Sequence, residues 1–218
     1  MTSGYALADN PGGRWAYNDY AIALYCRTLF TQTGDSVSVF GQSMSQVVAN
    51  RLAPLQFQDD GVIGSGRNGC QLYASARDFA RIGWWWLNRF KWKTQQLLPD
   101  SYFTNFVKNQ VSSSLPRTAG GPINDYLGVG TTGGDTNQNI LGQGSYGYNW
   151  TFNQPTRRWP SAPADTFQAR GHHNAEMMFM IPSRRLLLVC AKCRPSTDAA
   201  LYSDANRYLS LLLQADGG

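Results

Sequence analysis

One segment near the start of the chain brings together side chains that could transfer protons. It reads PGGRWAYNDYAIALY over residues 11–25, so that a proline and two glycines precede Tyr17, Asn18 and Asp19. A turn followed by a helix start would hold the Tyr17 phenol over a reaction centre, where it could act as a general base or acid. The same pattern also fits a structural role, with Tyr17 as a core aromatic residue and Asp19 as a helix N-cap.

A second segment holds both histidines of the chain. ARGHHN places His172, His173 and Asn174 after Arg170 and just before the apolar run EMMFMIP. An imidazole there could donate a hydrogen bond to a substrate carbonyl or carboxylate, and the backbone N–H near Asn174 could supply half of an oxyanion hole. The register counted back from the apolar run favours His173 over His172. Both histidines also fit as polar residues at a strand edge, and Arg170 fits equally as a surface arginine.

Helices must position the first of these segments, and four are predicted from helical spacing of apolar residues between capping signals. Their approximate ranges are 19–33, 43–53, 75–90 and 98–109. The second begins with a capping-box pattern at Ser43 and Gln46 and ends at Pro54. The segment 55–69 that follows is predicted to be a loop.

The helix predicted at 75–90 has the strongest local signal. Ser75 is its predicted N-cap, and its apolar stripe consists of Phe79, Ile82, Trp86, Leu87 and Phe90. Three successive tryptophans at 84–86 cannot all face the core, so at least one ring must point away from it. The rings could stack on a ligand, but packing against another part of the molecule is the favoured interpretation.

Strands must position the second segment. Ser, Gly, Thr and Asn dominate about 111–144, which predicts a boundary between a mainly helical lobe, 1–140, and a strand-rich part, 141–218, within one structural unit. In that second part GYNWTFN, EMMFMIP and LLLVCAKC are predicted strands, the last two joined by a tight turn. Residues 157–173 are predicted to be a proline-broken excursion. An amphipathic helix is predicted to end at Gly217, with Leu201, Ala205, Leu209 and Leu212 on its apolar stripe.

Composition argues against two classes of partner. The net charge of +5 comes from scattered basic pairs rather than from a stripe, which argues against nucleic-acid binding. No apolar run approaches the roughly 18 residues needed to cross a bilayer, and the N-terminus lacks the pattern of an export signal, so no membrane partner is expected.

The four cysteines are predicted to be buried free thiols. Cys190 and Cys193 are three residues apart in a predicted strand and would point to opposite faces, which disfavours both a local disulfide and shared metal ligation. We therefore expect no metal site and no cofactor.

The order of these segments resembles the serine β-lactamase and penicillin-binding-protein family, in particular its branch of β-lactamase-like esterases and amide hydrolases. PGGRWAYNDYAIALY is similar to the family's tyrosine-motif segment, and ASARDFARIGWWWLNRFKWKTQQLLPDSY to the helix and turn that follow. GYGYNWTFN, APADTFQARGHHN and EMMFMIP complete the likeness. The resemblance touches most of the chain and implies an α+β, β-lactamase/DD-peptidase-like fold with an antiparallel sheet flanked by helices plus a helical lobe.

The resemblance also implies roles for individual residues. Such enzymes combine a Ser-x-x-Lys helix start, a Tyr-x-Asn loop and a Lys-Thr-Gly-like strand. Tyr17 would be the base that activates the serine, Asp19 would replace the usual asparagine, and His173 would replace the Lys-Thr-Gly element. Substrate contacts would come from Trp150, Arg170, His172 and Asn174.

One element of the family is missing from the chain, because no serine has a lysine three residues later. MTSGY resembles a segment that follows the nucleophile helix, so the chain is expected to be a C-terminal portion, truncated before Ser-x-x-Lys, or a noncatalytic derivative. Ser3 and Ser75 are weaker nucleophile candidates. The resemblance implies that relatives are often periplasmic or secreted bacterial proteins, and the compartment of this chain is not predicted.

Two alternative functions are therefore expected. The first is a serine hydrolase that acts through an acyl-enzyme on small-molecule esters or amides, and the second is a noncatalytic ligand-binding or structural remnant of that fold. Without the family's N-terminal strands, the hairpin of EMMFMIP and LLLVCAKC would expose an apolar edge. The sequence therefore predicts either self-association through that edge or a rearranged sheet that covers it.

Overall fold

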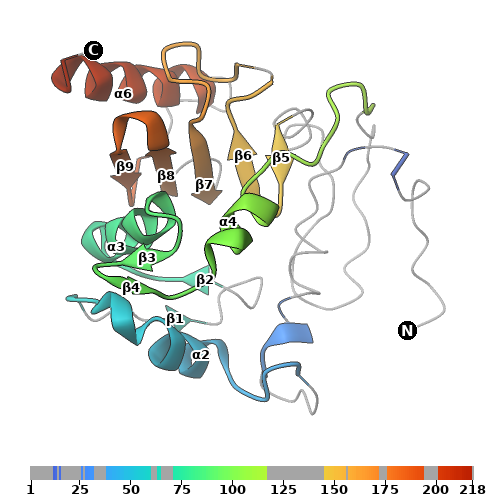
Figure 1. Cartoon of the computed structure of the whole chain (residues 1–218), viewed down its shortest axis with the longest axis vertical. Helices are drawn as coiled ribbons and strands as arrows, with labels where there is room; N and C mark the ends of the chain where they lie inside the picture. The colour runs from blue at the N-terminus through green and yellow to red at the C-terminus, as the bar shows by residue number, and fades with distance from the viewer. Residues whose placement is uncertain are drawn as a thin grey trace. The chain divides into compact units, whose positions relative to one another are not determined.

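The protein is a mixed α+β structure with an antiparallel sheet, as the computed structural model shows (Figure 1). The described residues are 12–13, 15, 26, 28–31, 38–59, 63–64, 71–116, 145–155, 157–171, 176–193 and 201–217. The chain divides into two compact units. Unit 1 comprises residues 1–56, 60–74 and 114–143, and unit 2 comprises 57–59, 75–113 and 144–218.

Unit 1 contains the predicted second helix, which is confirmed as α2, Met44–Arg51. The Ser43 Oγ accepts the Gln46 N–H at 3.2 Å and the Gln46 Oε1 accepts the Ser43 N–H at 2.8 Å, which is the predicted capping box. Helix η1, Ala53–Leu55, contains Pro54. The predicted loop 55–69 is wrong in part, because β1, Ile63–Gly64, pairs with β2, Gln71–Leu72. Most of the helix predicted at 19–33 lies outside the described residues.

The first helix of unit 2 is α3, Ala76–Leu87, as predicted. Ser75 is its N-cap and accepts the Asp78 N–H at 3.1 Å. Trp85 is buried and Trp84 is 38% exposed, which confirms that one ring of the triplet points away from the core. A hairpin of β3, Lys91–Trp92, and β4, Gln95–Gln96, follows, and α4, Asp100–Phe106, confirms the helix predicted at 98–109.

The main sheet of unit 2 has five antiparallel strands in the order β5-β6-β7-β8-β9 (Figure 1). Their bounds are β5 Tyr146–Gly147, β6 Trp150–Phe152, β7 Phe167–Gly171, β8 Glu176–Ile181 and β9 Leu186–Cys190. The hairpin of β8 and β9 is confirmed, and η3, Pro182–Arg184, is its turn.

One strand prediction is wrong, and the excursion predicted at 157–173 is wrong in part. GYNWTFN is not one strand, because Tyr148 (φ 50°) and Asn149 (φ 69°) form a turn between β5 and β6. Two consecutive left-handed residues are the geometry of a tight hairpin turn, and asparagine tolerates it. The excursion predicted at 157–173 contains β7, which pairs along its whole length with β8. Because the segment contains polar residues, its strand was not recognised from the sequence.

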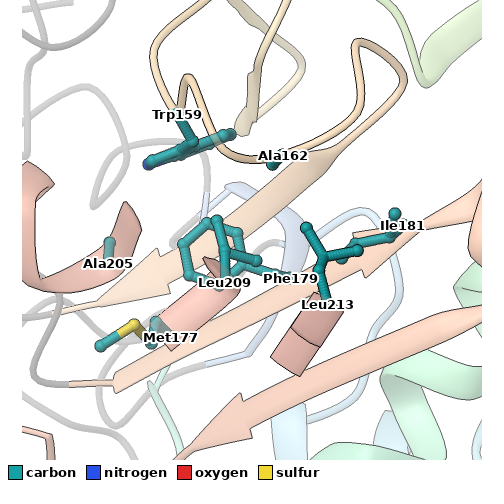
Figure 2. Packing of buried hydrophobic residues seen from close by; sticks show 8 residues of the cluster. All are labelled: Trp159, Ala162, Met177, Phe179, Ile181, Ala205, Leu209 and Leu213. Carbon is teal, nitrogen blue, oxygen red and sulfur yellow. The ribbon is translucent and has the colours of Figure 1, made fainter. Parts of the chain in front are cut away.

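The two faces of the sheet pack against different helices. On one face, hereafter the α6 face, β8 packs against α6, Leu201–Ala215, and against Trp159 from the loop between β6 and β7 (Figure 2). Ala205 and Leu209 are buried there as predicted, and Gly217 adopts φ +83° after the helix. On the opposite face, hereafter the α3 face, Gly83 of α3 lies against Met178 and Leu187. No helix among the described residues is long and apolar enough to cross a membrane.

The prediction of free thiols is wrong. Cys190 and Cys193 form a disulfide with a Cα–Cα distance of 5.7 Å, and Cys26 is also disulfide-bonded. The prediction failed because β9 ends at Cys190, so that the alternation of a strand does not extend to Cys193. Residues 191–192 form a bend instead, which brings the sulfur of Cys193 to that of Cys190.

Candidate functional site

Of the seven residues that the sequence assigns to catalysis or substrate binding, the described structure contains two. Arg170 lies in β7 and Trp150 lies in β6. The remaining five, which are Tyr17, Asp19, His172, His173 and Asn174, lie outside the described residues. Their predicted roles stay predictions.

The ends of β7 and β8 frame the segment that carries both histidines. Gly171 is the last residue of β7 and pairs with Glu176, the first residue of β8. The four residues 172–175 join these two strand ends. The predicted histidine site is therefore bordered by two described residues, Gly171 at the end of β7 and Glu176 at the start of β8.

Arg170 belongs to a row of three residues across this end of the sheet. It pairs with Met177 of β8, and Met177 pairs with Cys190 of β9. Met177 is part of the core under α6, so strand alternation places Arg170 on the α6 face. A guanidinium at the end of a sheet can bind a carboxylate or a carbonyl oxygen.

Trp150 lies on the other face of the same sheet. Its ring is 4.5 Å from the ring of Trp86 and 5.4 Å from the ring of Phe167, measured between centroids, and both contacts are edge-to-face. The structure therefore does not bring Trp150 and Arg170 to one face. Trp85 packs edge-to-face on Phe90, and Trp86 packs on Trp150. These two rings of the tryptophan triplet therefore serve packing, which was the favoured interpretation.

Sequence reasoning missed Glu176 as a member of this sheet end. The residue is half-buried, and a Cβ built on Gly171 would lie 3.4 Å from its Oε2. A carboxylate immediately after the histidine segment can accept hydrogen bonds from an imidazole or from a substrate hydroxyl. The signal in the sequence was a single acidic residue at the start of an otherwise apolar strand.

Ser75, one of the weaker nucleophile candidates, is engaged at the start of α3. Its Oγ accepts the Asp78 N–H and donates to the Asp59 Oδ2 at 2.7 Å. The fully buried Asp78 carboxylate accepts the N–H of Gln58 at 2.8 Å and the N–H of Asp59 at 3.0 Å. Arg81 approaches Asp78 at 3.8 Å. These contacts describe a helix cap that anchors residues 57–59, with the hydroxyl committed to structure.

Comparison with known proteins adds no family to this description. The chain matches no protein-family model and no curated protein. Among the described residues, no three His, Cys, Asp or Glu side chains gather closely enough to hold a metal ion.

Proposed function

We propose that the protein is a serine hydrolase of the β-lactamase-like class, with a β-lactamase/DD-peptidase-like fold, that acts on small-molecule esters or amides through an acyl-enzyme, in a chain that lacks the family's usual Ser-x-x-Lys nucleophile. The observation that carries the proposal is the order of its segments, from the tyrosine motif to the GHHN segment and the EMMFMIP strand. The antiparallel hairpin of β7 and β8 supports it, because that hairpin has the GHHN segment at its connection.

The proposed chemistry assigns one task to each predicted residue. Tyr17 removes the proton from the attacking serine hydroxyl and later returns it to the leaving group. The Asp19 carboxylate accepts a hydrogen bond beside Tyr17. His173 and the backbone N–H near Asn174 stabilise the oxyanion of the tetrahedral intermediate. Arg170 and His172 contact the acyl part of the substrate, and Trp150 supports the site from the α3 face.

A second candidate function is ligand binding without turnover. The observation that favours it is the absence from the sequence of any serine with a lysine three residues later. A serine hydroxyl is a poor nucleophile until a nearby base removes its proton, so a chain without that pair can keep the binding groups of the fold and lose its reaction.

The test is covalent labelling of the purified chain with a fluorophosphonate, followed by intact-mass measurement, together with hydrolysis of a short-chain nitrophenyl ester. The hydrolase proposal predicts one adduct per chain on a serine that peptide mapping identifies, and it predicts turnover. If the chain gave no adduct and no turnover, the hydrolase proposal would be overturned in favour of ligand binding without turnover.

Two substitutions separate a specific reaction from background reactivity. Tyr17→Phe removes the proposed base and should lower the rate of labelling by about a hundredfold or more. Tyr208→Phe changes a partly exposed tyrosine of α6 in the same way and should leave the rate unchanged. Equal rates in the two variants would remove Tyr17 from the mechanism.

A further inference from the structure

We propose that the Cys190–Cys193 disulfide is a redox switch, which exchanges with a dithiol and controls the order of the sheet end beside residues 172–175. The two cysteines lie at the end of β9 and just beyond it, and both are half-buried. The proposed switch involves only the disulfide and strand β9, which ends at Cys190. It does not require the protein to be a hydrolase.

The Cys190–Cys193 disulfide joins two partly exposed residues. An attacking thiolate must reach a sulfur atom, so a disulfide exchanges only where solvent reaches it. Cys190 and Cys193 are each partly exposed, whereas Cys26, which is also disulfide-bonded, is 0% exposed. The same chain therefore contains a disulfide between two partly exposed residues and, in Cys26, a buried disulfide-bonded cysteine for comparison.

The Cys190–Cys193 disulfide closes a very small loop. Only Ala191 and Lys192 separate the two cysteines. A disulfide stabilises a fold largely by restraining the unfolded chain, and this effect grows with the length of the loop that it closes. A two-residue spacing gives nearly the smallest such effect, so reduction of this bond is compatible with a folded protein.

The disulfide lies at the end of the sheet that carries Arg170. Cys190 pairs with Met177, and Met177 pairs with Arg170, in the row next to Gly171 and Glu176. Cys190 and Cys193 both pack against the core under α6. While the bond is intact, residues 191–193 are tied to the end of β9. When it is broken, the chain beyond Cys190 loses that tie, and the last pairs of β8 and β9 lose a restraint.

The exchange reaction balances without any further reactant. A thiolate of the external dithiol attacks one cysteine sulfur, the S–S bond breaks, and the other sulfur leaves as a thiolate that takes up a proton. The second thiol of the reagent then resolves the mixed disulfide. Cys190 and Cys193 end as two thiols, having gained two electrons and two protons, and the reagent ends as a disulfide.

The first experiment measures which disulfide reacts. The folded protein is equilibrated with graded ratios of reduced to oxidised dithiothreitol, free thiols are alkylated with iodoacetamide, and the cysteine peptides are quantified by mass spectrometry. We expect half-alkylation of Cys190 and Cys193 at a ratio about tenfold or more below that for Cys26. Alkylation of Cys26 at the same or a lower ratio would overturn the proposal.

The second experiment measures the response of the sheet by hydrogen exchange. Amides of residues 186–190 should exchange about tenfold faster in the reduced protein than in the oxidised one, and those of α3 should not change. The Cys190→Ser/Cys193→Ser double variant should reproduce the reduced pattern without reductant. Identical exchange in reduced and oxidised wild-type protein would overturn the switch, whether or not the double variant folds.

Discussion

The two faces of the five-stranded sheet are built by different means. The α6 face combines an apolar cluster with buried polar side chains, among them Thr151, Asn153 and Gln168, which are each at most 2% exposed. The α3 face is lined by rings, including Trp150, Phe152 and Phe167. Hydrogen bonds fix the partners of a buried polar group, whereas ring contacts are satisfied in several edge-to-face arrangements. The α6 face should therefore tolerate substitution less well than the α3 face.

Asn153 shows how the α6 face is fixed. Its Oδ1 accepts the backbone N–H of Trp159 at 2.7 Å, and its Nδ2 shares two hydrogens among the carbonyls of Trp159, Ala162 and Pro163 at 2.9–3.1 Å. One amide thus closes the loop between β6 and β7 and holds the Trp159 ring edge-to-face on Phe179, with centroids 4.9 Å apart. Trp159 is fully buried in this position (Figure 2).

The largest effect is therefore expected for Asn153→Ala. The change removes the side-chain partner of the Trp159 backbone N–H and of the Ala162 carbonyl, while the carbonyls of Trp159 and Pro163 keep the N–H groups of Ala162 and Thr166. We expect it to lower the free energy of unfolding by about 3–5 kcal/mol. Urea unfolding followed by tryptophan fluorescence measures the loss. Asn206→Ala is the matched control, because the Asn206 amide bonds Ser161 in a more exposed setting, and it should cost only about 0.5–1.5 kcal/mol. Equal losses in the two variants would contradict a polar anchor on the α6 face.

The α3 face is tested by the approach of its helix. A Cβ built on Gly83 would lie 2.5 Å from the Leu187 Cδ1 and 2.6 Å from the Met178 Sδ, both of them parts of flexible side chains. Overpacking costs about 1–3 kcal/mol, while alanine in place of glycine favours a helix by roughly 1 kcal/mol. We expect Gly83→Ala to destabilise the protein by about 1 kcal/mol, as measured by urea unfolding, and Gly83→Val to destabilise it more. A Gly83→Ala variant more stable than wild type would show that the α3 face repacks freely.

The sequence predicted local features well where the signal was itself local. Ser43 with Gln46, and Ser75 before an apolar stripe, marked the starts of α2 and α3, because a cap is made by residues three positions apart. The hairpin of β8 and β9 was predicted from two apolar runs that flank a short turn. In these elements the sequence within a few residues determines the structure.

The features that the sequence did not predict depend on distant partners. Strand β7 contains Gln168 and Arg170, and Gln168 is 1% exposed, so only its pairing with β6 and β8 reveals it as a central strand. The candidate site shows the same limit. Trp150 and Arg170 were expected to serve one substrate, and their separation onto two faces follows from a register that the sequence does not display. The Cys190–Cys193 bond was missed because the end of β9 was placed too late.

The smallest effect is expected at the exposed side of α4, where Arg89 pairs with Asp100. The Arg89 Nη2 donates to the Asp100 Oδ2 at 2.7 Å, its Nε donates to the other carboxylate oxygen, and its guanidinium lies 4.5 Å from the Phe103 ring centroid. The hydrogen bond from Arg89, followed by its charge, lowers the pKa of Asp100 from its ordinary value. A lowered pKa means that the stabilisation is present at neutral pH and is lost in acid, as the pH falls through the lowered pKa of Asp100.

We therefore expect Asp100→Asn to lower the urea midpoint slightly at pH 7 and to match wild type in strong acid, with the difference at pH 7 shrinking in about 1 M salt. Arg89→Ala should cost more than Asp100→Asn, because it also removes the cover from the Phe103 ring and the bond to Thr104. A double-variant comparison separates the two contributions. If the two single variants lost equal stability, the contact of the Arg89 guanidinium with the Phe103 ring would contribute nothing. The α3 face would then depend on contacts between its rings alone.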